Sequence, residues 1–274
     1  MRIKKRIRKV MFPWKEEGHS KKGALPDFII IGAQRCGTSF LYDRLCEHPY
    51  VERAATKEVH YFDRKFDKGT DWYKSCFPPP AQKEGRRVIT GEASPYYLYY
   101  PHAAGRAAKV VPQAKLIALL RNPVDRAYSN YQLQTRLGRE PLSFEEAIEA
   151  EEDRLRGEED RMLADESYVS VNHQRFSYLS RGIYVDQLQE WHKFFKKEQV
   201  LILKSEDFFS YTLDTLKLIS DFLNLPDWWD PRSLEPHRQN DYAHMNPVTR
   251  ERLTSYFEPH NRRLYTYLGI DFGW

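Results

Sequence analysis

The fold of this chain is decided by one stretch, Phe28-Ile29-Ile30-Ile31-Gly32-Ala33-Gln34-Arg35-Cys36-Gly37-Thr38-Ser39-Phe40. Its apolar start predicts a short buried strand, and its two glycines bracket a turn that opens a helix. Such a turn presents successive backbone N–H groups, and the helix N-terminus adds partial positive charge. We therefore interpret this turn as a phosphate-binding loop.

The residues of this loop restrict the class of phosphate ligand that it can bind. The spacing of Gly32 and Gly37 matches the start of a Walker A loop, but Thr38 stands where a nucleoside triphosphatase needs a lysine. The cation of the loop is Arg35 instead, so a P-loop kinase is the weaker alternative. Cys36 lies among backbone donors that would lower the pKa of its thiol, but we expect a small space-filling residue there, with a reactive thiol as the weaker alternative.

The rest of the chain alternates short apolar runs with amphipathic segments. We expect further strands at residues 88–92, 116–120 and 200–203, and an extended run at 58–62. We expect helices at residues 38–48, 124–134, 184–195 and 207–223, and one that begins at the capping box of Ser143 and runs to about residue 160. This order predicts an α/β fold with a P-loop-like central parallel sheet flanked by helices.

The composition is that of an ordinary globular protein, with 41% hydrophobic and 30% charged residues. The net charge of +4 is too small to indicate a nucleic-acid partner by itself. Lys and Arg dominate residues 2–9, so we expect residues 1–24 to form a basic, flexible segment or an arm that touches an anionic partner. Residues 25–274 are predicted to form a single domain.

Two expectations concern location and metals. No apolar run approaches the roughly 18–20 residues that span a bilayer, and no hydrophobic signal core follows the basic start. The sequence therefore predicts a cytoplasmic protein, unless an anchor was trimmed. Cys36, Cys46 and Cys76 lack metal-type spacing, so we expect no disulfide framework, no zinc site and no metal cofactor.

Candidate site residues follow from the rule that ligands bind beyond the carboxyl ends of parallel strands. Arg121 stands at the end of the 116–120 strand, and Ser129 follows about two helical turns later. They could hold a second phosphate, so the ligand would carry two separated phosphates. Glu58 and His60 would share one face of an extended run, where Glu58 could remove a proton from a nucleophile.

Six segments occur in an order that matches a known family. They are Ile29-Ile30-Ile31-Gly32 with Arg35-Cys36-Gly37-Thr38-Ser39; Lys57-Glu58-Val59-His60-Tyr61-Phe62-Asp63; Trp72-Tyr73; Gly91-Glu92-Ala93-Ser94-Pro95-Tyr96; Leu119-Leu120-Arg121-Asn122-Pro123 with Arg126 and Ser129-Asn130-Tyr131; and Tyr256-Phe257 with Asn261, Leu264, Gly269 and Trp274. The chain resembles the sulfotransferases that use 3′-phosphoadenosine 5′-phosphosulfate (PAPS). Within them it is most similar to the heparan sulfate glucosaminyl N- and 3-O-sulfotransferases.

The resemblance implies a role for each matching residue. Glu58 would be the general base, His60 would line the acceptor site, and Arg35 would stabilise the charge that develops as sulfonate departs and 3′,5′-ADP forms. The implied donor-binding residues are Arg35, Cys36, Gly37, Thr38, Ser39, Arg121, Ser129 and Arg238. We also expect acceptor contacts from Glu92 and from the rings of Tyr96 and Tyr184, which could stack on a sugar or an aromatic acceptor.

The chain also departs from the family pattern. Ala93 stands where the heparan sulfate enzymes place a lysine, and the late Lys-Gly-Arg cofactor loop has only Arg238 nearby as a cation. The acceptor therefore stays open between a glycan and a smaller molecule, with a hydroxyl or an amine as the nucleophile. A scaffold protein that binds PAPS or 3′,5′-ADP without turnover is the alternative from another functional class.

Overall fold

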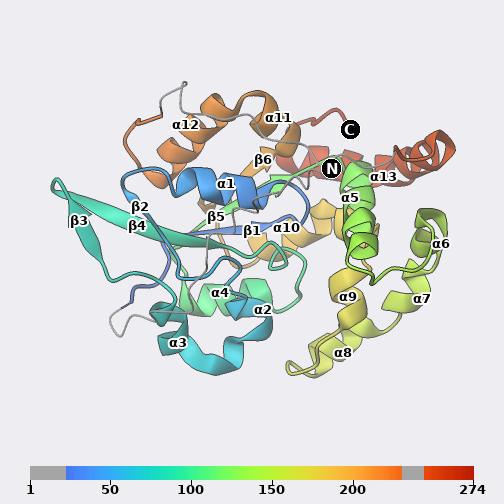
Figure 1. The fold of residues 1–274 in the computed structure, drawn as a ribbon, viewed down its shortest axis with the longest axis horizontal. Coiled ribbons are helices and arrows are strands. Elements are labelled where there is room, and N and C mark those ends of the chain that lie inside the picture. Colours follow the sequence, from blue (N-terminus) through green and yellow to red (C-terminus); the bar gives the residue numbers. More distant parts are fainter. Residues whose placement is uncertain (1–22, 230–243) are drawn as a thin grey trace, which may run out of the picture.

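The computed structural model describes residues 23–229 and 244–274, and its strands form one mostly parallel sheet (Figure 1). The strand order is β2-β4-β1-β5-β6, and β3 adds an antiparallel partner to β4. The strands are β1 Phe28–Gly32, β2 Val51–Arg53, β3 Ala81–Lys83, β4 Arg86–Ala93, β5 Lys115–Leu120 and β6 Val200–Lys204. The predicted central parallel sheet is therefore confirmed.

Helices cover both faces of this sheet. In Figure 1, α1 (Thr38–Leu45), α11 (Ser205–Ser210) and α12 (Thr212–Leu223) lie on one side, and α2 (Tyr61–Arg64), α3 (Gly69–Ser75) and α4 (Ala103–Val110) lie on the other. Because both faces are covered, β1 is buried along its whole length, as an all-apolar parallel strand requires.

A second group of helices lies beyond the end of the sheet. It contains α5 (Pro123–Arg136), α6 (Phe144–Glu149), α7 (Glu151–Leu155), α8 (Glu158–Ala164) and α9 (Val171–Arg175) (Figure 1). The long α13 (Pro247–Leu268) packs against α5 and against α10 (Tyr184–His192). A separate apolar cluster joins α5, α6 and α13, with Val124, Ala127, Phe144 and Phe257 among its members.

The expected extended run at residues 58–62 is wrong. Glu58 and His60 both have φ near 57°, and α2 begins at Tyr61. The backbone N–H of His60 donates to Ser94 Oγ at 3.2 Å, and the N–H of Tyr61 donates to the Tyr97 hydroxyl at 2.7 Å. These bonds to the segment after β4 hold the chain in a tight turn.

Four expected helices differ in extent, and the first of them, α1, ends at Leu45 instead of residue 48. The segment after Ser143 does form the predicted capping box, but it divides into α6, α7 and α8, with Gly157 at φ 71° before α8. Residues 207–223 divide at Tyr211 into α11 and α12, and α10 ends at His192 instead of residue 195. The basic segment at residues 1–24 lies almost wholly outside the described residues and stays a prediction.

Candidate functional site

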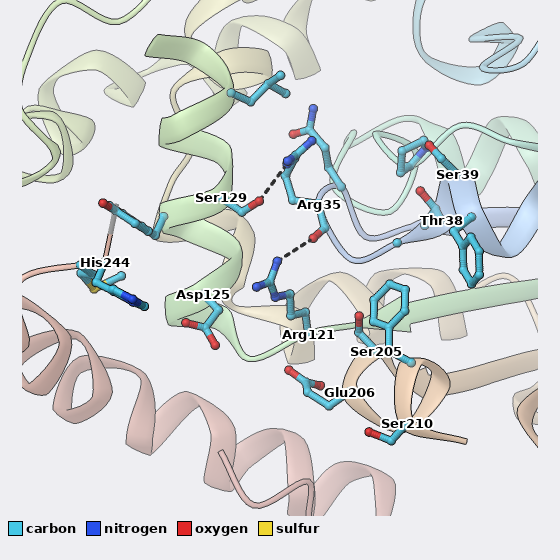
Figure 2. Close-up of a pocket in the computed structure, with 18 of the residues that line it drawn as sticks. Arg35, Thr38, Ser39, Arg121, Asp125, Ser129, Ser205, Glu206, Ser210 and His244 are labelled. Atoms are coloured by element: carbon cyan, nitrogen blue, oxygen red, sulfur yellow. Dashed lines mark hydrogen bonds between the residues drawn. The ribbon is translucent and has the colours of Figure 1, made fainter. Parts of the chain in front are cut away.

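A cleft with a volume of about 790 Å³ opens at the carboxyl ends of β1, β5 and β6 (Figure 2). It contains seven of the predicted site residues: Arg35, Gly37, Thr38, Ser39, Glu58, Arg121 and Ser129. These residues come from three separate parts of the chain. They meet in one cleft, as expected from the rule that ligands bind beyond the carboxyl ends of parallel strands.

The loop after β1 is tightly packed. Gly37 has φ 95°, and a Cβ added to it would stand 2.6 Å from the Phe209 ring. The N-cap residue of the following helix α1 is Gly37, which has no side chain to bond to the N–H groups of the first turn, so these groups can bond to a ligand. The backbone therefore fits the predicted phosphate-binding role.

The predicted pKa of Cys36 is wrong in direction. The thiol is fully buried, and burial raises its pKa to about 11, despite the opposing charges of Arg126 and Arg121. A thiol with so high a pKa is unreactive at neutral pH. Cys36 therefore fills space behind the loop, and only its backbone remains a candidate for donor contact.

Two arginines meet at one end of the cleft. Arg35 Nε donates to Ser129 Oγ at 3.1 Å, and Arg121 Nη1 lies 3.5 Å from the carbonyl oxygen of Arg35 (Figure 2). The carbonyl of Arg121 accepts a bond from the Tyr184 hydroxyl at 2.8 Å. The Arg35 guanidinium beside the Ser129 hydroxyl, with Arg121 lining the same cleft, forms a site suited to an anion.

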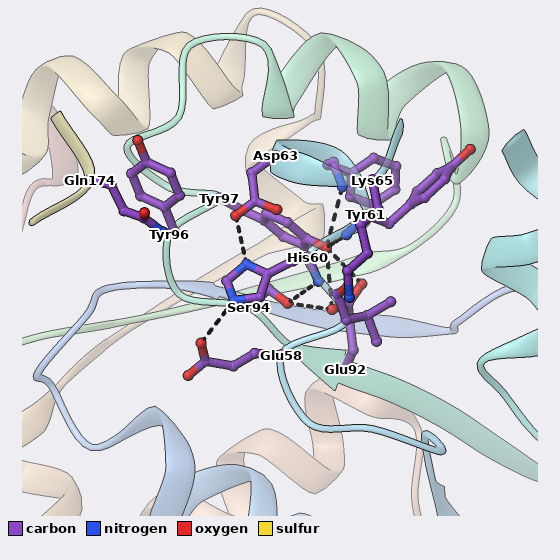
Figure 3. Close-up of polar contacts among 12 residues, drawn as sticks. Glu58, His60, Tyr61, Asp63, Lys65, Glu92, Ser94, Tyr96, Tyr97 and Gln174 are labelled. Carbon is purple, nitrogen blue, oxygen red and sulfur yellow. Dashed lines mark hydrogen bonds and ion pairs between the residues drawn. The ribbon is translucent and has the colours of Figure 1, made fainter. Parts of the chain in front are cut away.

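Glu58 belongs to a chain of three charged groups (Figure 3). His60 Nε2 lies 3.1 Å from Glu58 Oε2, and His60 Nδ1 lies 2.7 Å from Asp63 Oδ2. Burial would lower the pKa of His60, but its bonds to Asp63 and Glu58 raise it to about 9. Burial would raise the pKa of Glu58, but His60 and Lys57 bring it below its usual value. At neutral pH, Glu58 is thus ionised and His60 is protonated.

The burial of Glu92 argues against its predicted contact with the acceptor. Its side chain is 0% exposed, and its carboxyl group accepts hydrogen bonds from Tyr73 and Ser94 at 2.6 Å and from Tyr97 at 3.2 Å (Figure 3). Burial raises its pKa to about 7. The hydroxyls of Ser94 and Tyr97 also accept hydrogen bonds from the backbone N–H groups of residues 60–62. Through these two side chains, Glu92 stabilises the turn that carries Glu58.

The two predicted acceptor tyrosines are buried as well. Tyr96 is 6% exposed and its hydroxyl lies 2.7 Å from His173 Nδ1, while Tyr184 is 1% exposed. Neither ring lines the cleft, so neither presents a face on which an acceptor could stack. Arg238 lies outside the described residues.

Sequence reasoning missed several cleft residues. Asp125 follows Arg121 by one helical turn, and Glu206 follows the end of β6, so the strand-end rule could have found both. Arg250 reaches the cleft from α13 and forms an ion pair with Asp125 at 2.7 Å. No sequence pattern near Arg250 predicts its contact with Asp125, because the contact depends on the packing of α13 against α5.

Comparison with known proteins identifies the family. The family model described as "Sulfotransferase domain" matches residues 25–264. A crystal structure of a sulfotransferase from Alicyclobacillus acidocaldarius has a TM-score of 0.68 and 32% identity, and the match covers 91% of this chain and 98% of that one. The chain belongs to the sulfotransferase domain family.

Two curated relatives add detail. The heparan sulfate glucosamine 3-O-sulfotransferase 3B1 of Homo sapiens is 30% identical over 273 residues, which cover 91% of this chain and 65% of that protein. The membrane-associated sulfotransferase kil1 of Dictyostelium discoideum is 29% identical over 315 residues, with coverage of 91% and 66%. The predicted resemblance to heparan sulfate sulfotransferases is confirmed, and the chain spans just under two thirds of these relatives' length.

The name of kil1 bears on location. A relative described as membrane-associated lends no support to the predicted cytoplasmic location. Within residues 23–229 and 244–274, no helix is long and apolar enough to cross a membrane.

Proposed function

We propose that this protein transfers the sulfonate group of PAPS to a hydroxyl or amine of a glycan or small-molecule acceptor. The observation that carries the proposal is the cleft itself: a phosphate-binding loop, a second anion site at Arg121 and Ser129, and the carboxylate of Glu58 line one space. A donor with separated 5′ and 3′ phosphates matches this arrangement, and its product is 3′,5′-ADP.

Each group has a distinct task in this reaction. Loop N–H groups and the Thr38 and Ser39 hydroxyls hold the 5′-phosphate, while Arg121 and Ser129 hold the 3′-phosphate. Glu58 accepts the proton of the acceptor as its oxygen or nitrogen bonds to sulfur. His60 bonds to both Glu58 and Asp63 and so keeps the Glu58 carboxylate in place. Positioning and charge stabilisation supply most of the rate enhancement, as in phosphoryl transfer.

The names of the relatives suggest which class of acceptor to assay first. The human relative is named for glucosamine in heparan sulfate, which makes a glycan hydroxyl the first acceptor to assay. Ala93 stands where the heparan sulfate enzymes place a lysine, so this chain lacks a cation there that could attract a polyanionic glycan. Uncharged glycans and small alcohols or amines therefore belong in the same acceptor screen.

The test is a calorimetric titration with 3′,5′-ADP, 5′-AMP and ATP. Micromolar binding of 3′,5′-ADP, with a clear preference over 5′-AMP, is expected because the second phosphate meets Arg121. A preference for ATP would favour the kinase alternative. Absence of binding to all three nucleotides would overturn the proposal.

A scaffold protein would also bind 3′,5′-ADP, so a second step separates binding from turnover. Incubation with PAPS and a panel of acceptors should release 3′,5′-ADP in the wild type. The Glu58→Gln variant should bind 3′,5′-ADP as the wild type does but release it from PAPS about 100-fold to 10,000-fold more slowly. Binding without turnover in the wild type would favour the scaffold.

A further inference from the structure

Lys57 contacts the phosphate-binding loop from outside it. Its ammonium donates a hydrogen bond to Ser39 Oγ, and Ser39 lies in the first turn of α1 and lines the cleft. Lys57 is half-buried and directly precedes Glu58 in the turn that follows β2. The lysine therefore lies between the loop and the carboxylate that faces the acceptor.

The arginine of the loop points elsewhere. Arg35 Nε is bonded to Ser129, at the end of the cleft where Arg121 lies, and Figure 2 shows Thr38 and Ser39 away from this pair. The carboxyl end of β4 carries no cation, because its last residue is the fully buried Ala93, and Arg86 and Arg87 of this strand lie at its opposite end. Lys57 is thus well placed to supply positive charge at the Ser39 side of the cleft.

We propose that Lys57 is a catalytic residue whose ammonium binds the 5′-phosphate of the sulfonate donor beside Ser39. This inference rests on the proposed function. In the transfer, the bond between sulfur and the bridging oxygen breaks, and its electron pair stays on that oxygen, which becomes part of the 5′-phosphate. A new bond forms from the acceptor oxygen or nitrogen to sulfur, and the acceptor proton passes to Glu58. Lys57 stabilises the negative charge that develops on the bridging oxygen.

The surroundings of Lys57 fit this role. Burial lowers its pKa, while the neighbouring charges of Glu58 and Asp43 oppose that shift. A partly desolvated ammonium interacts more strongly with an incoming phosphate than a fully hydrated one does. The same ammonium also lowers the pKa of Glu58 and so favours its ionised form. One lysine would thus act on both the donor phosphate and the base.

The experiment compares two nucleotides that differ only at the 5′ position: 3′,5′-ADP and adenosine 3′-monophosphate. Calorimetry is run on the wild type and on Lys57→Met, Lys57→Arg, Arg121→Ala and Lys217→Met. Lys217 is an exposed lysine of α12 that, unlike Lys57, has no bond to the phosphate-binding loop within the described residues, and it serves as the matched control.

The expected pattern is specific. Lys57→Met weakens 3′,5′-ADP binding by about 10-fold to 100-fold, the usual range for a lost charge-assisted bond, and leaves adenosine 3′-monophosphate binding within about twofold. Lys57→Arg retains most of the affinity because it keeps the charge. Arg121→Ala weakens both nucleotides, and Lys217→Met changes neither.

Other patterns overturn the inference and are separable from failure of the proposed function. Equal losses for both nucleotides in Lys57→Met would mean a structural role, and unchanged affinity would mean no contact. If Lys57→Met does not fold, Lys57→Gln takes its place in the same comparison. A wild type that binds neither nucleotide would refute the proposed function itself.

Discussion

Glu58 is the side chain on which turnover should depend most. Replacement by Gln removes the proton acceptor but keeps the shape, so we expect the rate of 3′,5′-ADP release from PAPS to fall by about 100-fold to 10,000-fold. The affinity for 3′,5′-ADP should change little, because Glu58 is not among the groups assigned to either phosphate. Turnover at the wild-type rate in this variant would refute the role of Glu58 as base.

His60 should couple stability to pH. Its pKa of about 9 in the folded protein exceeds the usual value of about 6.5, so the protonated form stabilises the fold. This contribution is fully present below about pH 6.5 and is lost as the pH rises through about 9. The shift corresponds to stabilisation on the order of 3 kcal/mol.

Urea unfolding of the wild type and His60→Gln at pH 6, 8 and 10 tests this coupling. The difference in unfolding free energy between the two proteins should be largest at pH 6 and should shrink toward pH 10. A difference that is constant over this range would show that His60 carries no extra proton in the folded state.

At the scale of elements, the start of α5 links helix stability to ligand binding. The Asn122 side chain accepts hydrogen bonds from the N–H groups of Val124 and Asp125, and its own N–H donates to Glu206 at 2.8 Å. Because α5 carries Ser129 and begins directly after Arg121, loss of this cap should disturb the proposed 3′-phosphate site.

We expect Asn122→Ala to cost about 1 kcal/mol of unfolding free energy, the typical value for a helix cap, and to weaken 3′,5′-ADP binding as well. The matched control is Ser143→Ala, which removes the cap of α6 outside the cleft lining. It should lose similar stability without loss of affinity. Equal affinity losses in the two variants would show that the effect is general destabilisation.

The elements also show where sequence reasoning succeeds and where it fails. The apolar runs of β1 and β5 were predictable because strands buried on both faces need uninterrupted apolar residues. The strands β2 and β3 have three residues each, too few for any periodicity to show. The turn at Glu58 was mispredicted because its conformation depends on bonds to Ser94 and Tyr97, more than thirty residues away.

The candidate site divides in the same way. Arg35, Arg121 and Ser129 could be predicted because strand ends meet at one edge of a parallel sheet. Side-chain burial could not be read from the sequence, so Glu92 and Tyr184 were predicted as acceptor contacts although both are enclosed. Arg250 was missed because helix packing brings it to the cleft.

For the whole molecule, donor-site occupancy should stabilise the fold, because the cleft joins residues from the loop after β1 to α13 that separate on unfolding. At a concentration of 3′,5′-ADP about 100 times its Kd, the expected gain is about 2.7 kcal/mol. For a chain of this size, that gain raises Tm by about 5–10 °C. Thermal scans with 3′,5′-ADP and with equal concentrations of 5′-AMP measure it, and equal shifts for the two nucleotides would argue against a second phosphate site.

The position of β1 in the sheet has a consequence for biosynthesis. It is the first strand of the sheet to leave the ribosome, yet it lies between β4 and β5, which are completed about 60 and about 90 residues later. At the usual ~5–20 residues per second, the nascent chain carries an unpaired, wholly apolar strand for about 3 to 12 s before β4 is available. The residues that form the centre of the folded protein are thus the part of the newborn chain most in need of protection from aggregation.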